Sequence, residues 1–449
     1  MSSFDRNIYN MSNYLFSDPI SWVHQTLIPS LSEDWPLLPV IHAEGVYLFT
    51  ADGRRYMDFT SGIAVTNVGH GHPRVLAAAR EQMEKFSHCA VGITVHEPLM
   101  KLSEALSMAM PEGMEMFFYG NSGAEAVEGA LKLARFVTRR PGIIAFEGSF
   151  HGRTYGATSV TSMKSKYRKH YEPMLSGIYF APYAYPYRCP EGNDDATVIG
   201  WSIAGLQNIF DHYIVPEDVA AILVEPVQGE GGYIVPPKGF LHAIRDICDE
   251  HGILLIFDEV QTGFGRTGQM FAAQSFNVNP DIMSIAKGIA NGFPLSATVA
   301  SRKLMSRWSA GSHGTTYGGN PISCAAALAV LDVIRDENLL QNCREIGDFF
   351  LEALRNLKGK YPFIGDVRGI GLMVALEVIK PGSNKEPDGY AAFSILNHCL
   401  DRGLVGYMAG IQGQVIRFMP PLNVTHEQVS EAVNILDISM ATYSNSLTS

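Results

Sequence analysis

The sequence predicts an α/β protein that has a large domain, with a mostly parallel sheet flanked by helices, plus a smaller α+β domain. Three observations support this fold class. From about residue 75, helical stretches alternate with short apolar runs, as they do in parallel sheets that are covered on both faces. A long helical stretch follows Asn320 and is expected to bridge to the smaller domain. The chain has 449 residues, which is enough for two or three domains with a large core.

The order of the expected elements gives the domain boundaries. Residues 1 to about 40 are rich in Trp, Pro and Ser and are expected to form an arm. Two short strands around an Asp52-Gly53 turn follow in "GVYLFTADGRRYMDFTSG". The predicted divisions are an N-terminal arm with part of the small domain in residues 1–74, a large domain in residues 75–334, and a C-terminal small domain in residues 335–449.

The composition is that of an ordinary globular protein, with 46% hydrophobic and 18% charged residues. A net charge of −11, without a dense block of Lys and Arg, argues against nucleic acid or an anionic membrane as the main partner. The most basic stretch, "KSKYRKH" (164–170), is interpreted as a solvated face or loop. The six cysteines are scattered, which favours reduced thiols in a cytoplasm over a disulfide framework or a metal site. No apolar stretch approaches the roughly 20 residues that span a bilayer, so a soluble cytoplasmic protein is expected.

Five apolar runs mark the expected strands of the large domain, and a Gly or an acid follows each of them. Ligands of parallel sheets bind beyond the carboxyl ends of the strands. The residues that follow the runs are therefore candidates for a binding site. The runs are "EMFFYG", "GIIAFEG", "AAILVEP", "GILLIFDE" and "DIMSIAKG".

The first two runs lead to a turn and to an aromatic loop. After the first, "YGNSGAEAVEGALKLAR" (119–135) predicts a turn and then a helix, whose free N–H groups form an anion site with the Ser122 hydroxyl. Ordinary helix capping is the alternative. After the second, Phe150 and His151 precede Arg153 in "SFHGRTYGA". Phe150 is suited to stack on a planar ring and Arg153 to hold a carboxylate, with a surface loop and a core Phe as the alternative.

The other three runs lead to charged residues. Glu225 and Glu230 bracket a Gly-rich loop in "ILVEPVQGEGGY", where glycines let the backbone approach a ligand, although both acids also suit a polar loop. Asp258 ends the fourth run, and Lys287, with apolar neighbours, ends the fifth. Apolar surroundings lower the pKa of a lysine and favour its neutral, nucleophilic form. Most lysines near strands, however, only extend their amine to solvent.

Together these features predict a site for pyridoxal 5′-phosphate. The phosphate of this cofactor suits a helix N-terminus, its ring suits an aromatic neighbour, and its aldehyde needs a lysine. Its pyridinium nitrogen needs an acid that keeps the ring an electron sink, and Asp258 would meet this need. The buried carboxylate would be very costly without such a partner.

The sequence resembles the class III pyridoxal-phosphate aminotransferases of fold type I from about Gly45 to Leu422. The resemblance rests on an ordered set of motifs, "NSGAEAVEGALKLAR", "FHGRT", "EPVQGEGG", "DEVQTGFGRTG", "AKGIANGFPL" and "TYGGNP". It is closest to the bacterial 4-aminobutyrate aminotransferases and the ω-aminotransferases around them. Members of this family are homodimers with active sites at the interface, so a homodimer or a higher homo-oligomer is expected.

The resemblance implies the cofactor site residue by residue. Lys287 would form the Schiff base with pyridoxal phosphate and move the proton between Cα and C4′, while Asp258 would pair with N1. Phe150 and Val260 would lie on the two faces of the ring, and Gln261 would bind near O3′. The other expected cofactor-binding residues are Ser122, Gly123 and Ala124 at the phosphate, Thr316 at the phosphate of the neighbouring subunit, and His151 and Glu225.

The resemblance also implies the substrate site. Arg153 would hold the distal carboxylate of the substrate, and Arg417 would hold the α-carboxylate of glutamate or 2-oxoglutarate. Glu230 would pair with Arg417 when the amine donor has no α-carboxylate. Ile63 would lie near the substrate chain, and Glu225 would help to position Arg153 or the substrate pocket. No metal is expected.

The implied activity is transfer of the amino group of an ω-amino acid, above all 4-aminobutyrate, to 2-oxoglutarate, which gives the semialdehyde and L-glutamate by a ping-pong mechanism. Alternatives are an ornithine, acetylornithine or β-alanine aminotransferase, and a racemase or epimerase of hydrophobic amino acids. "PYAYPYRCP" (182–190) resembles a loop of both the ω-amino-acid branch and the racemases. A non-catalytic binding protein of the same fold is disfavoured because Lys287 and Asp258 are both present.

Overall fold

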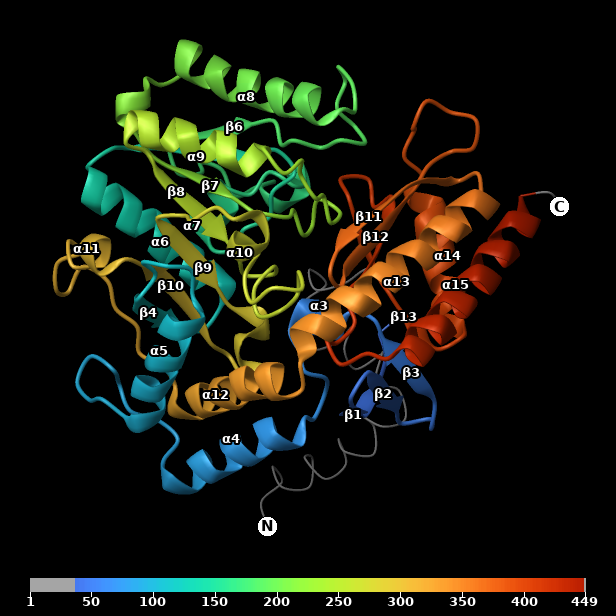
Figure 1. Ribbon diagram of the computed structural model, residues 1–449, viewed down its shortest axis with the longest axis horizontal. Helices are drawn as coiled ribbons and strands as arrows, with labels where there is room; N and C mark the ends of the chain where they lie inside the picture. The colour runs from blue at the N-terminus through green and yellow to red at the C-terminus, as the bar shows by residue number, and fades with distance from the viewer. Residues whose placement is uncertain (1–36, 448–449) are drawn as a thin grey trace, which may run out of the picture.

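A seven-stranded sheet forms the centre of one half of the structure, a computed structural model that describes residues 37–447 (Figure 1). Only β10 runs antiparallel to its neighbours. The five apolar runs are all strands of this sheet, so the predicted mostly parallel sheet is confirmed, whereas the run pattern does not reveal β6 and β10. In spatial order the strands are β4 (Met116–Gly120), β10 (Ser296–Ala300), β9 (Ile282–Ile285), β8 (Leu254–Asp258), β7 (Val219–Val224), β5 (Gly142–Phe146) and β6 (Ile178–Ala181).

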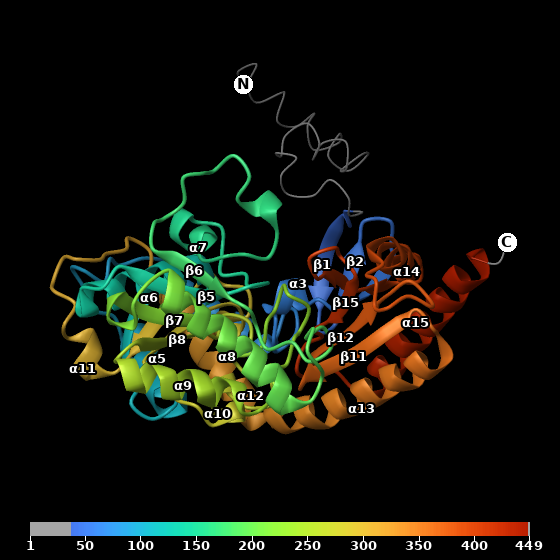
Figure 2. The ribbon, with the colours of Figure 1, turned by 90° about the horizontal axis from the view of Figure 1, so that it is seen from above.

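Helices cover both faces of this sheet, because successive side chains of a strand point to opposite sides. On one face, Ile143 and Ile256 share a core with α6 (Gly123–Thr138) and α7 (Tyr155–Ser159). On the other, Ile144 and Phe257 share a core with α9 (Phe240–His251), and Figure 2 shows α7 and α9 on opposite sides of the strands. The remaining helices of this half are α4 (Pro73–Lys85), α5 (Glu97–Ala109), α8 (Asp195–His212), α10 (Ala272–Phe276) and α11 (Arg302–Met305).

The long helical stretch after Asn320 is two helices, α12 (Pro321–Asp336) and α13 (Leu339–Lys360). Asn320 caps the first, since its side chain accepts hydrogen bonds from two backbone N–H groups of the first turn. Asn338 breaks the stretch with a φ of 52°, a left-handed conformation that Asn tolerates. Figure 1 shows α12 beside the seven-stranded sheet and α13 in the other half, so the break lies where the chain passes between the halves.

The other half contains two four-stranded sheets. One is antiparallel, in the order β11 (Ile364–Ile370), β12 (Met373–Val378), β15 (Val415–Phe418) and β14 (Tyr407–Ala409). The other consists of β1 (Val40–Glu44), β2 (Tyr47–Thr50), β3 (Arg55–Asp58) and β13 (Leu404–Val405), and β3 pairs in parallel with β13. The two strands predicted around Asp52-Gly53 are confirmed as β2 and β3. The helices here are α3 (Ser61–Ala64), α14 (Gly389–Asp401) and α15 (His426–Ser446), together with α13.

The predicted arm lies almost wholly outside the described residues, and the predicted domain boundaries near residues 75 and 335 stay a prediction. Over residues 37–447, no helix combines the length and the apolar character needed to cross a membrane.

Candidate active site

A cavity of about 180 Å³ lies at the carboxyl ends of the predicted strands. Segments that follow β4, β5, β7, β8 and β9 all contribute to its wall. The structure therefore brings together residues that are up to 164 positions apart, from Gly123 to Lys287. The predicted site residues in this wall are Gly123, Ala124, Phe150, His151, Glu225, Glu230, Asp258, Val260, Gln261 and Lys287.

Asp258 is the last residue of β8 and is only 5% exposed. One carboxylate oxygen accepts a hydrogen bond from Val260 N at 3.0 Å, and the other lies 2.7 Å from His151 Nδ1. His151 is buried as well, and its Nε2 has no hydrogen-bond partner within residues 37–447. Two neighbours thus fix the carboxylate at the strand end while it lines the cavity.

Glu225 follows β7 and joins two of the loops around the cavity. Its carboxylate accepts hydrogen bonds from Phe150 N at 2.9 Å and from Gly229 N at 2.7 Å. Burial raises the pKa of Glu225 to about 7, because loss of solvent disfavours the charged form. Glu225 therefore anchors the backbone of the segments that carry Phe150 and Glu230, rather than contacting Arg153 directly.

Lys287 begins a short 3-10 turn, Lys287–Ala290, just after β9. Its φ of 48° is uncommon for a residue with a side chain, and such conformations cluster at functional sites. Burial, with the positive charge of Arg417 as a second cause, lowers the pKa of Lys287 from 10.5 to about 8. The neutral, nucleophilic amine is therefore far more populated near neutral pH than that of an exposed lysine.

The start of α6 brings backbone N–H groups to the cavity wall. Ser122 caps this helix, since its Oγ accepts a hydrogen bond from Glu125 N at 3.3 Å. A Cβ on Gly123 would lie 2.7 Å from Val260 Cγ1. Only glycine lets the start of the helix approach Val260 this closely. The Ser122 cap and the predicted anion site therefore lie in the same turn, which Gly123 brings to the cavity wall.

Arg417 lies on β15, is 1% exposed, and contacts Glu230. Its Nη2 donates a hydrogen bond to Glu230 Oε2 at 2.5 Å. The guanidinium also lies 5.2 Å from the ring of Tyr407 and 5.5 Å from that of Tyr233. Its Nε and Nη1 have no hydrogen-bond partner in the part of the chain that the structure describes. The two residues that the resemblance pairs are thus in contact, and the guanidinium keeps donors that suit a second carboxylate.

Arg153 is exposed and rests on two aromatic rings. Its guanidinium lies 3.7 Å from the ring centroid of Tyr167 and 5.4 Å from that of Phe150. Tyr167 belongs to "KSKYRKH", the stretch interpreted as a solvated face or loop. Lys166 and Lys169 are exposed, but the ring of Tyr167 is half-buried beneath Arg153. An aromatic residue inside a basic run was the available signal.

Ile63 and Thr316 lie outside the wall of this cavity. Ile63 is 39% exposed in α3, where four successive residues have positive φ between 48° and 66°, a strained left-handed turn. Thr316 is exposed in the loop before α12, beside Gly318, where a Cβ would collide with the carbonyl of Tyr119. Their roles toward the substrate and the neighbouring subunit stay predictions.

The family model for class III aminotransferases matches residues 30–439. This chain is a class III aminotransferase. It is 40% identical over 395 residues to the 4-aminobutyrate aminotransferase of Escherichia coli (strain K12), which covers 88% of this chain and 91% of that protein. It is 38% identical over 408 residues to an alanine/serine racemase of Pyrococcus horikoshii, a match that covers 90% of this chain and 85% of that protein. Among solved structures, this chain is similar to a taurine:2-oxoglutarate aminotransferase from Bifidobacterium kashiwanohense in complex with pyridoxal phosphate and glutamate. The TM-score is 0.89 at 30% identity, and the match covers 95% of this chain and 97% of that one.

Class III aminotransferases are enzymes that use pyridoxal phosphate, and the predicted family, fold type and cofactor are confirmed. The residues of this aminotransferase fit the cofactor. The lowered pKa of Lys287 suits a reaction with an aldehyde, and the fixed carboxylate of Asp258 suits a pyridinium nitrogen. His151 Nε2 and Gln261 Oε1 are buried without a partner among the described residues, and both residues line the cavity. Since unpaired buried polar atoms are costly, a polar ligand edge is expected beside them.

Proposed function

We propose that this aminotransferase moves the amino group of an ω-amino acid, above all 4-aminobutyrate, to 2-oxoglutarate and forms L-glutamate. The contact between Glu230 and Arg417 carries this proposal. One site has to accept a donor without an α-carboxylate and then an acceptor that has one. A buried arginine is costly without a partner, so an acid that pairs with it in the first case and leaves in the second meets both demands. The activity of the Escherichia coli relative supports the choice of donor.

Lys287 and Asp258 are the proposed catalytic residues. Bound pyridoxal phosphate supplies the electron sink that stabilises negative charge on the substrate carbon. The amine of Lys287 binds the aldehyde and moves the proton at the substrate carbon, because burial lowers its pKa and so raises the fraction of neutral amine. The carboxylate of Asp258 holds a proton on the ring nitrogen, and His151 fixes the direction of this carboxylate.

The remaining predicted residues are proposed to hold the cofactor and the substrate. Phe150 and Val260 confine the ring from the wall of the cavity. Arg153 binds the distal carboxylate, and Tyr167 holds its guanidinium in place. The proposed phosphate ligands are Ser122, Gly123 and Ala124 at the start of α6 and Thr316 of a neighbouring subunit, so a homodimer or a higher homo-oligomer is proposed. A cytoplasmic location is proposed as well, supported by six free cysteines.

A half-reaction tests this proposal. The purified enzyme with bound cofactor is mixed with 4-aminobutyrate in the absence of a keto acid, and its absorbance spectrum is followed. Conversion of bound pyridoxal phosphate to pyridoxamine phosphate, reversed by 2-oxoglutarate, is expected. If L-ornithine or β-alanine converts the enzyme and 4-aminobutyrate does not, the proposed donor is wrong and a sister ω-aminotransferase takes its place.

A racemase of hydrophobic amino acids is the second candidate, because the Pyrococcus horikoshii relative is a racemase at almost the same identity. A racemase of one α-amino acid has no need for an acid that leaves Arg417, so the Glu230 contact favours transamination. The same enzyme sample separates the two. A hydrophobic L-amino acid that loses its optical purity, while no amine donor changes the spectrum, would establish the racemase.

A further inference from the structure

We propose that Arg368 is a positioning residue for Glu230. It fixes the backbone of the loop that carries this acid, and so sets the balance between substrates without and with an α-carboxylate. The inference rests on the proposed roles of Glu230 and Arg417. Arg368 lies on β11, in the half of the structure opposite the strands that end at the cavity.

Arg368 contacts the loop two residues after Glu230. Its Nε donates a hydrogen bond to the carbonyl of Gly232 at 2.8 Å. Gly232 has a φ of +116°, and a Cβ there would lie 2.9 Å from both Arg368 Nη2 and Val415 Cγ2. The guanidinium is therefore pressed against the loop backbone where no side chain fits.

The loop is anchored from both halves of the structure, with Glu230 between the anchors. Before Glu230, Gly229 N donates a hydrogen bond to the carboxylate of Glu225 at 2.7 Å, in the half that contains the seven-stranded sheet. At Glu230 itself, the backbone carbonyl accepts a hydrogen bond from Gly410 N at 3.0 Å. After Glu230, the carbonyl of Gly232 accepts the hydrogen bond from Arg368. Arg368 lies in the same sheet as Arg417, and Gly410 directly follows β14 of that sheet. The loop therefore spans the two halves, and the reach of Glu230 depends on both.

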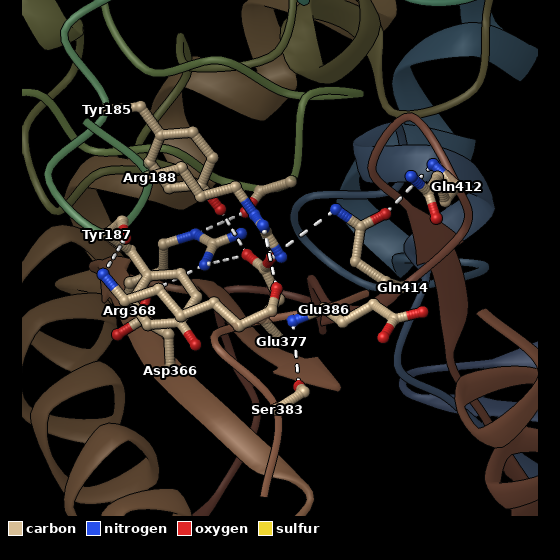
Figure 3. A network of polar contacts seen from close by, with 12 residues as sticks. Tyr185, Tyr187, Arg188, Asp366, Arg368, Glu377, Ser383, Glu386, Gln412 and Gln414 are labelled. Atoms are coloured by element: carbon tan, nitrogen blue, oxygen red, sulfur yellow. Dashed lines mark hydrogen bonds and ion pairs between the residues drawn. The ribbon is translucent and has the colours of Figure 1, made fainter. Parts of the chain in front are cut away.

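A buried ion network fixes the direction of the Arg368 guanidinium (Figure 3). Glu377, on β12, is fully buried and accepts hydrogen bonds from Arg368 Nη1 at 2.8 Å and from Arg188 Nε at 2.6 Å. Asp366 accepts a second bond from Arg368 Nη1 at 2.8 Å, and the hydroxyl of Tyr185 donates to Glu377. Because the guanidinium is a rigid planar fork, acids bound at Nη1 aim the Nε–H group at Gly232.

The network also compensates the buried positive charge of Arg368. The neighbouring acids and Tyr185 raise the pKa of Arg368, although burial alone would lower it. The two arginines lower the pKa of Glu377 against the effect of burial. Tyr185 and Arg188 come from the "PYAYPYRCP" segment of the first half, as Figure 3 shows, so the network ties this segment to β11 and β12.

This arrangement lets the Glu230 side chain move while its backbone stays in place. With the loop fixed, Glu230 returns to Arg417 whenever the bound substrate has no α-carboxylate. With a loosened loop, the pair forms less often, and donors such as 4-aminobutyrate meet an uncompensated Arg417. Substrates that bring their own α-carboxylate are not penalised, because they displace Glu230 in any case.

The test compares Arg368→Gln with Arg188→Gln, a matched control that loses a bond to the same Glu377 but does not touch the loop. The ratio of kcat/KM for the 4-aminobutyrate half-reaction to that for the L-glutamate half-reaction is measured on enzyme with bound cofactor. Arg368→Gln is expected to lower this ratio about tenfold, as loss of a buried hydrogen bond from a charged donor would. Arg188→Gln is expected to keep the wild-type ratio.

A binding measurement adds a readout that does not depend on turnover. Calorimetric titration of the same proteins with glutarate, which carries two carboxylates, and with butyrate, which carries one, is expected to show a preference shifted toward glutarate in Arg368→Gln only. Should Arg368→Gln fold poorly, Arg368→Lys carries the same expectation. Its ammonium still pairs with Glu377 and Asp366 but presents no fork to aim at Gly232.

An unchanged ratio in both Arg368 variants overturns the positioning role, and so does an equal fall in Arg368→Gln and Arg188→Gln. Glu230→Gln separates this result from a failure of the proposed function. If Glu230→Gln lowers the ratio and the Arg368 variants do not, only the positioning role is wrong. If Glu230→Gln leaves the ratio unchanged, the acid does not act as proposed on Arg417, and both proposals are wrong.

Discussion

Replacing Lys287 by methionine is expected to make the cofactor-free enzyme more stable at neutral pH. The structure lowers the pKa of Lys287 to about 8, mainly by burial and secondly through Arg417. Near pH 7 the folded protein therefore holds a charged ammonium in a site that disfavours the charge. Methionine fills a similar volume without a charge, so folding of the variant avoids this cost.

The pKa values give the size and the pH window of the effect. The pKa falls from 10.5 to about 8, and at about 1.4 kcal/mol for each tenfold change in proton affinity the cost is about 3 kcal/mol. Below about pH 8, folded and unfolded chains both hold the proton, and the whole cost is present. Between pH 8 and 10.5 the unfolded chain keeps a proton that the folded chain has released, so the stability of the wild type rises with pH. Above this window the variant has no advantage.

Urea unfolding of the cofactor-free proteins at matched concentration, from pH 7 to 10, measures this difference. Lys287→Met should exceed the wild type by about 3 kcal/mol in free energy of unfolding at pH 7, and the two curves should converge as pH rises toward 10. Lys303→Met removes an exposed lysine of α11 and should run parallel to the wild type. Parallel curves for Lys287→Met, or a variant that is less stable at pH 7, would refute the reasoning.

Four further changes probe the candidate active site. Asp258→Asn should lower half-reaction rates by about 100-fold and leave the urea midpoint unchanged, and near-normal rates would remove the charge argument. Arg153→Ala should lower kcat/KM for ω-amino acids far more than for simple amines. Tyr167→Leu should show the same pattern with a loss of about 2–5-fold, which corresponds to one exposed cation–π contact. Equal losses for both substrate types would contradict the role of Arg153. Gly123→Ala should weaken cofactor binding about tenfold in titrations of the cofactor-free enzyme, because its Cβ would lie 2.7 Å from Val260, and wild-type affinity would show that α6 can shift.

Much of the site could be predicted because its chemistry sits at strand ends. A continuous apolar run shows a buried parallel strand, and the residue after it must face the edge where ligands bind. Asp258 and Lys287 stand out for this reason, since each places a charge against a run that has none. The same reasoning gives no hint of β10, whose sequence "SATVA" includes two hydroxyl residues and lacks a charged end.

What could not be predicted depends on pairings between distant residues. Arg368 and Gly232 are 136 positions apart, and Arg188 and Glu377 are 189 apart, so no local pattern links them. Asn338, in a left-handed conformation, breaks a stretch whose apolar residues follow the spacing of one helix. A single left-handed residue changes that spacing in the sequence very little, so the break could not be predicted. Tyr167 lies between Lys166 and Lys169, which are exposed as a basic run predicts, so the composition of the run gives no hint of its contact with Arg153.

The pairing of β3 with β13 has a consequence for how the protein is made. Met57 pairs with Leu404, so the first sheet of the chain cannot close until Leu404 has left the ribosome. During that time β3 has an unpaired edge of the kind that recruits other chains. A nascent chain that stops before Leu404 should therefore be cut by a protease within residues 40–58, where the complete enzyme resists, and equal resistance would show that β1–β3 close alone. A stop codon before the position of Leu404 would thus prevent closure of the sheet formed by β1–β3 as well as removing the residues that follow it.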